Sequence, residues 1–196
     1  MKIVVKLLML YITVQASAQI EIPLEDFYSP GFGDKRGSDY YYKDSNGILD
    51  KFIGTWRYQT DTELFEVTFS KRVKNKTGMG YYDDDLAGNY KYIKNGQVIY
   101  DTYSTIPGPD TLTYFIFGRR IKKPNLEIIS LLYNEPEVRS GPYDSVTLKH
   151  EYISRDRIEV LQWKVSKNIL IVNFDKLKKP RSEFKVPWNM SLTKVE

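Results

Sequence analysis

The chain has few of the side chains that act as nucleophiles or bind transition metals. His150 is the only histidine, and the chain has no cysteine. Disulfides, nucleophilic triads and metal sites built on thiolates or several histidines therefore lack their parts. His150 lies on the apolar side of an alternating run, where we favour a buried structural role over that of a donor in a ligand pocket. We expect no catalytic residue, no metal site and no cofactor.

Two sets of carboxylates point to other chemistry. Asp83, Asp84 and Asp85 are adjacent, and calcium binds carboxylate oxygens, but their spacing differs from that of an EF-hand loop. On a strand, adjacent carboxylates would point to opposite faces and could not converge on one ion. We therefore predict that these three aspartates form a solvated loop. Glycoside hydrolysis needs two carboxylates that converge in space, one of them in an apolar setting. The strand carboxylates, which mostly alternate to the polar face, are Glu63, Glu66, Glu151 and Glu159. A carboxylate-dependent hydrolase is therefore only a minor alternative.

Aromatic side chains give the strongest signal for a binding site. The chain is 14% aromatic and contains 16 Tyr. Rings with a few polar tips suit a small, partly apolar ligand, but small barrels are often filled by their own side chains. The sequence does not separate these two interpretations. The predicted ligand-binding residues are Tyr58, Tyr90, Tyr92, Tyr100, Tyr114, His150 and Tyr152.

Alternating apolar runs define the elements that would position these rings. A short helical turn leads into a first strand through Gly54-Thr55-Trp56, and a hairpin partner follows over 63–69. Residues 71–76 indicate a basic turn, and Asn95-Gly96 is a hairpin signal. Further strands are predicted over 88–94, 97–103, 111–117, 125–133, 145–153, 157–165, 168–174 and 188–195. This pattern predicts an all-β protein with a single antiparallel barrel of roughly 8–10 strands, because closure removes exposed edges.

The first residues have the layout of a secretory signal. Residues 1–18 contain two lysines, an apolar run over 7–14 and the small residues Ala16-Ser17-Ala18. The run is too short to cross a bilayer, so we predict cleavage after Ala18 and no integral membrane segment in the mature chain. The location would then be periplasmic or secreted. Residues 19–46 are rich in turn formers and predict an extended arm with little structure of its own, followed by the barrel domain over 47–196.

Charge argues against one class of partner. The formal charge is +4, and the leader contributes Lys2 and Lys6 but no acid, which leaves +2 for the mature chain. So small a surplus does not indicate a nucleic-acid-binding protein.

Two resemblances follow from these residues. Gly54-Thr55-Trp56 on the first strand of a barrel resembles the Gly-x-Trp opening of lipocalin-like (calycin) barrels. That resemblance implies a basic residue of the last strand packed on the tryptophan. Lys194 occupies the corresponding place in this chain, although Arg is commoner there. Gly54, Trp56 and Lys194 are accordingly expected to be structural residues.

Three segments in order are also similar to an uncharacterised family of small exported bacterial proteins, a domain of unknown function. They are residues 49–56, 81–92 and 190–194. The resemblance implies a compartment and a fold, and no activity. We therefore predict a non-enzymatic, exported, lipocalin-like protein that binds a small, partly apolar ligand in its barrel. The alternative is a cell-envelope module with a filled barrel and a protein partner.

Overall fold

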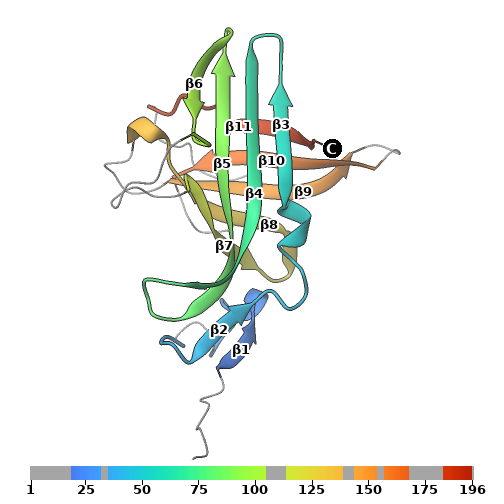
Figure 1. Cartoon of the computed structure of the whole chain (residues 1–196). Coiled ribbons are helices and arrows are strands. Elements are labelled where there is room, and N and C mark those ends of the chain that lie inside the picture. The colour runs from blue at the N-terminus through green and yellow to red at the C-terminus, as the bar shows by residue number, and fades with distance from the viewer. Residues whose placement is uncertain are drawn as a thin grey trace, which may run out of the picture.

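The computed structural model describes residues 19–31, 35–104, 114–138, 144–153, 157–167 and 183–195. Regular structure in these ranges is almost entirely β, with three single turns of 3-10 helix (Figure 1). The strands are β1 (Ile20–Pro23), β2 (Tyr40–Lys43), β3 (Gly54–Gln59), β4 (Glu63–Lys76), β5 (Tyr82–Lys94), β6 (Gln97–Asp101), β7 (Ile116–Lys122), β8 (Asn125–Tyr133), β9 (Asp144–Ile153), β10 (Ile158–Ser166) and β11 (Asn189–Lys194). The 3-10 turns are η1 (Leu24–Asp26), η2 (Asp50–Phe52) and η3 (Pro136–Val138). None of the described residues forms a helix long and apolar enough to span a membrane.

Eight of the strands close into an antiparallel barrel. Their order is β5-β4-β3-β11-β10-β9-β8-β7, and β7 pairs with β5 to complete the circle. The prediction of an all-β protein with a single antiparallel barrel is confirmed, as is the short helical turn before the first strand. The run 125–133, apolar on both faces, and the alternating run 145–153 identified β8 and β9 almost to the residue.

β5 is the strand on which the sheet converges. One of its edges pairs with β4 along almost its whole length. The other edge is shared by three strands in turn: β2 at Tyr82 and Asp83, β7 between Leu86 and Gly88, and β6 from Lys91 onward. At about 3.3 Å per residue, its 13 residues span roughly 40 Å. β4 and β5 therefore run past the barrel at both ends (Figure 1).

Two charged stretches are strand rather than turn or loop, so both predictions for them were wrong. Residues 71–76 form the second half of β4, with a register shift between Arg72 and Asn75. The run Asp83 to Asp85 is the start of β5, and all three carboxylates are buried. Each carboxylate has its own partners: Arg72 pairs in register with Asp85 across the hairpin, Arg119 of β7 pairs with Asp83, and Asp84 accepts hydrogen bonds from Tyr41 and the backbone. Charged residues can occupy a strand when partners of opposite sign face them.

The N-terminal segment is part of the sheet, contrary to the expectation of little structure. β1 and β2 form a parallel ladder, and β2 continues it onto β5. Ile22, Leu24 and Tyr42 of this segment are buried in the main core. The segment thereby covers the lower end of the barrel in the orientation of Figure 1. The leader, residues 1–18, lies outside the described residues.

β7 begins later than predicted. The predicted strand over 111–117 overlaps it only at Ile116 and Phe117, and Tyr114 precedes it. Residues 111–113, like the predicted strand over 168–174, lie outside the described residues. The remaining predicted strands correspond to β3, β4, β5, β6, β10 and β11 with shifted ends.

The barrel interior is packed with rings. Trp163 has its ring centroid 4.9 Å from that of Phe65 and 5.4 Å from that of Tyr133, and Phe65 lies 5.4 Å from Tyr90. All four side chains are at most 1% exposed. Close packing of this kind leaves the middle of the barrel to the protein's own side chains.

Candidate functional site

Three of the predicted ligand-binding tyrosines donate their hydroxyl hydrogen bonds to acceptors within the protein. The Tyr90 hydroxyl donates to the carbonyl of Asn134 at 3.4 Å, and the Tyr92 hydroxyl donates to Glu63 Oε1 at 3.1 Å. Tyr100 donates to Glu135 Oε2 at 3.1 Å. Burial and these carboxylates raise the pKa of Tyr92 and of Tyr100 well above the ordinary value. These three hydroxyls are therefore already used by acceptors within the protein.

His150 and Tyr152 lie elsewhere, on β9. His150 is buried, its Nδ1 is 3.2 Å from Glu127 Oε2, and its ring meets that of Tyr152 edge-on at 5.2 Å. Tyr152 is half exposed. Tyr58 is half-buried on β3. The structure does not bring these three side chains and the core tyrosines into one pocket.

The first and last strands of the barrel meet at the three predicted structural residues. Lys194 pairs in register with Trp56, and its Nζ lies 5.3 Å from the centroid of the Trp56 ring. Gly54 has φ +115°, a left-handed conformation that glycine adopts at little cost. A Cβ on Gly54 would lie 3.4 Å from Lys194 Cε, an ordinary contact distance, so the positive φ is what calls for glycine here. The indole Nε1 donates to the carbonyl of Phe52 at 3.0 Å.

A pocket of 690 Å³ lies on the outer wall of the barrel. Leu86 of β5 faces the interior, so the residues on either side of it, including Asp85, face outward. Asp85 and Phe117 line this pocket. Its other walls are the turn between β4 and β5, the outer face of β8, and the N-terminal segment. Of the seven predicted ligand-binding residues, Tyr114 is the one that contributes to the lining.

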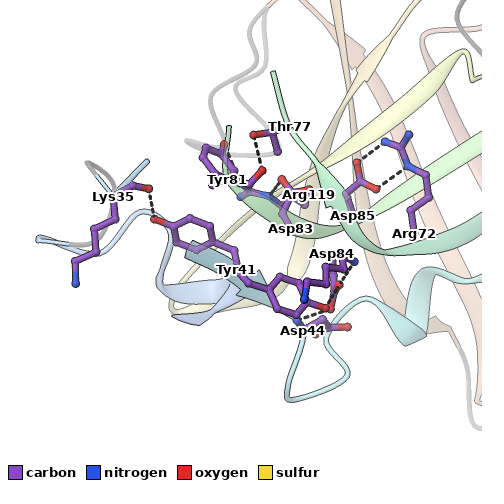
Figure 2. A network of polar contacts seen from close by, with 12 residues as sticks. Lys35, Tyr41, Asp44, Arg72, Thr77, Tyr81, Asp83, Asp84, Asp85 and Arg119 are labelled. Atoms are coloured by element: carbon purple, nitrogen blue, oxygen red, sulfur yellow. Dashed lines mark hydrogen bonds and ion pairs between the residues drawn. The ribbon is translucent and has the colours of Figure 1, made fainter. Parts of the chain in front are cut away.

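One end of the pocket is built around Arg119. This side chain is only 7% exposed and forms an ion pair with Asp83 (Figure 2). Its Nη2 donates to the Tyr81 hydroxyl at 3.0 Å, and its Cζ lies 4.1 Å above the centroid of the Phe27 ring. Burial raises the pKa of Asp83 to about 6, although Arg119 counteracts that rise. The carboxylate and the guanidinium are therefore held as a desolvated pair.

A second pair lies beside the first. Arg72 Nε donates to Asp85 Oδ1 at 2.8 Å, and its second nitrogen Nη2 donates to Oδ2, which makes a two-point contact (Figure 2). The Arg72 Cζ lies 5.2 Å from the Tyr114 ring and 6.0 Å from the Phe117 ring. Burial raises the pKa of Asp85 above its ordinary value, while Arg72 opposes the rise. This second guanidinium is thus fixed between a carboxylate and two rings.

Asp84 points to the other face of β5 and anchors the N-terminal segment. Its Oδ1 accepts from the Tyr41 hydroxyl at 2.6 Å and from the backbone of Lys74 at 2.9 Å. Its Oδ2 accepts from the backbone of Asp44 at 2.9 Å (Figure 2). Burial and this carboxylate raise the pKa of Tyr41. Asp84 is therefore structural, and it holds in place the segment that supplies Phe27 to the pocket.

Arg119 reaches its position because β7 is irregular. The register of β7 against β8 shifts between Phe117 and Arg120, and Gly118 has φ +131°. Such a bulge, with glycine at a positive φ, inserts residues into one strand and redirects the side chain that follows. The bulge therefore directs the guanidinium toward Asp83 and Phe27.

The charged lining of the pocket is mostly positive. Five cationic and two acidic side chains line the pocket, and no cluster of three metal-ligating side chains occurs among the described residues. The four carboxylates considered for hydrolysis do not line it. A hydrogen bond from a lysine lowers the pKa of three of them: Glu63, Glu151 and Glu159. A general acid needs a raised pKa.

Comparison with protein families matches residues 1–195 to a family of unknown function, DUF6705. The chain belongs to this family. No match is found among curated proteins or among solved structures. No activity is known for this family, so the function has to be inferred from the geometry of the pocket.

Most pocket residues were missed in the sequence. Arg36, Arg72 and Arg119 are widely separated along the chain, and no local motif joins them. Two signals did exist. Gly118 interrupts an apolar run, which is typical of a bulge, and the three aspartates directly precede the alternating part of β5.

Proposed function

We propose that this chain is an exported, non-enzymatic β-barrel protein that binds a small, partly apolar molecule in the outer-wall pocket. The observation that carries the proposal is the contrast between a barrel interior filled with aromatic rings and a 690 Å³ pocket lined by rings and fixed guanidinium groups. Pockets for small molecules commonly have about 300–1,000 Å³ and a few fixed polar groups among apolar walls. The proposed site is therefore outside the barrel and not in its lumen.

Pre-organisation supports binding. Both Arg72 and Arg119 are held by carboxylates and rings before any ligand arrives. Side chains that are already ordered lose little conformational entropy on binding, which favours affinity.

Export rests on the leader in the sequence. Cleavage after Ala18 would leave Gln19 as the first residue, directly before β1. The Gln19 side chain donates to the carbonyl of Ser38 at 2.8 Å, and the Ile20 backbone donates to that of Asp39 at 2.7 Å. The new terminus would therefore start in a hydrogen-bonded ladder. The Trp56–Lys194 contact supports a lipocalin-like relationship.

Native mass spectrometry of protein purified from its own host's envelope tests the proposal. The variant Gly78→Trp should block the pocket, because Gly78 lines it and a Cβ there meets no heavy atom within 4 Å. We expect a retained small-molecule mass in the wild type and its loss in this variant. The control is Gln97→Trp, an exposed position on β6 at the other end of β5. Equal retention by both variants would contradict a ligand in this pocket.

The second candidate is an envelope interaction module, which the filled barrel interior favours. The version in which the arm over 20–46 contacts the partner has less support, because Ile22, Leu24 and Tyr42 are buried in the core and β2 pairs with β5. A partner would have to bind the exterior. Cross-linking in intact envelopes followed by mass spectrometry distinguishes this candidate, since it expects a specific protein adduct that Gly78→Trp leaves intact.

A further inference from the structure

We propose that the ligand of the outer-wall pocket is a small organic anion that carries a flat unsaturated ring. This inference rests on the proposed function, in that it takes the pocket to be a small-molecule site. It adds that the ligand is negatively charged and that it contains a planar ring.

The charge follows from which pocket groups are already neutralised. Asp83 is paired with Arg119 and Asp85 with Arg72, so each carboxylate is matched by one guanidinium. Three further cations line the same pocket: Arg36, Lys76 and Arg120. Among the described residues, neither Arg36 nor Lys76 has an ion-pair partner. The lining therefore carries a surplus of positive charge, which an anion would neutralise.

Asp83 and Asp85 are not available to bind a cationic ligand. Asp83 Oδ2 accepts from Arg119, and Asp83 Oδ1 is buried away from solvent without a hydrogen-bond partner. Both oxygens of Asp85 accept from Arg72. A cationic ligand would have to displace a buried guanidinium, which leaves that charge uncompensated at a cost of several kcal/mol.

The flat ring follows from the way the guanidinium groups are layered. Arg119 lies over Phe27, and Arg72 lies near the rings of Tyr114 and Phe117. Guanidinium and aromatic planes attract one another when stacked, and Arg pairs with carboxylate or phosphate groups in a planar, two-point geometry. A flat ring in the ligand can stack on this layer, while the anionic group of the ligand meets Arg36 and Lys76, which have no ion-pair partner among the described residues.

Calorimetric titration of the purified protein at pH 7.5 and low salt tests the inference. The probes are 2-naphthoate, its neutral amide 2-naphthamide, the cation 2-naphthylmethylammonium, and inorganic sulfate, which has no ring. We expect naphthoate to bind at least about tenfold more tightly than the amide, since one favourable charge contact of about 1.4 kcal/mol is a factor of ten. We expect the cation and sulfate to bind more weakly than naphthoate.

Two variants make the test specific to the pocket. Arg36→Glu reverses an exposed lining charge, and we expect it to weaken naphthoate by about tenfold or more and to leave the amide unchanged. Arg157→Glu is the control, because Arg157 is also exposed but lies on the turn between β9 and β10 and does not line the pocket.

Each other outcome overturns a distinct claim. If the amide or the cation binds as tightly as naphthoate, or if Arg36→Glu and Arg157→Glu behave alike, the ligand is not selected as an anion, although the pocket remains a binding site. If a mass retained by native spectrometry disappears in Gly78→Trp while naphthoate does not bind, the ring-bearing anion is also wrong. If no probe binds and no retained mass depends on Gly78, the proposed function itself fails.

Discussion

The two faces of β5 differ in how completely their polar and aromatic groups are used. On the inner face, Tyr90 packs against the Phe65 ring, Tyr92 is buried in the same core, and both donate to protein acceptors. On the outer face, Asp83 and Asp85 fix two arginines beside a pocket that holds still more positive charge. The comparison teaches that the inner face of β5 is filled by the protein's own side chains, whereas its outer face lies beside a pocket with a surplus of positive charge.

The largest effect should come from the interior. We expect Trp163→Ala to lower the free energy of unfolding by about 3–5 kcal/mol, because a large ring is removed from a packed core. Urea denaturation followed by circular dichroism measures it. Ile158→Ala, on the same strand but 49% exposed, is the control and should change stability by about 0.5 kcal/mol or less. A small loss for Trp163→Ala would mean that the interior is not the main source of stability.

Breaking the buried pair on the outer face should have the next largest effect. We expect Arg119→Met to destabilise the protein by about 3 kcal/mol, because it leaves the Asp83 carboxylate buried and unpaired. The double variant Asp83→Leu/Arg119→Met should recover most of that loss, since both charges are then removed. Chemical denaturation of the wild type and the single and double variants provides the measurement. No recovery in the double variant would show that Arg119 contributes mainly through its ring contacts.

Lowering the pH should change the stability that the outer-face residue Asp83 contributes. Burial raises the pKa of Asp83 from 3.8 to about 6 in the folded state, so between about pH 4 and 6 the folded protein binds a proton that the unfolded chain does not. Stability contributed by this group therefore rises as the pH falls from about 7 to 4, by up to about 2–3 kcal/mol. The measurement is the difference in unfolding free energy between the wild type and Asp83→Asn across this range. A difference that stays flat would contradict the raised pKa.

The smallest effect is expected where the barrel's first and last strands meet. Lys194→Met removes the ammonium group from the Trp56 ring, and because Lys194 is partly exposed we expect a loss of about 0.5–1 kcal/mol. Lys194→Arg should retain most of the stability, which thermal unfolding of both variants would reveal. Equal losses in both would assign the effect to the lysine stem and not to its charge.

The sequence predicted the barrel well and the pocket poorly, for physical reasons. A continuous apolar run marked β8, and apolar alternation marked β9, so both strands were identified directly. Charged strand residues follow no such rule, because their burial depends on a partner across the sheet. The pairing of Arg72 with Asp85 depends on the register of β4 against β5, and the pairing of Arg119 with Asp83 joins residues 36 positions apart. Neither can be deduced without knowing which strands are neighbours.

The parallel attachment of β2 to β5 also sets an order of assembly. β2 is made before β5, yet it cannot pair until β5 is present to receive it, and closing the long stretch of chain between them costs entropy. Phe27 and Tyr28 belong to the same N-terminal segment and line the pocket. We therefore expect the pocket to be complete only once this segment has docked on β5, and a molecule bound there to slow the segment's release.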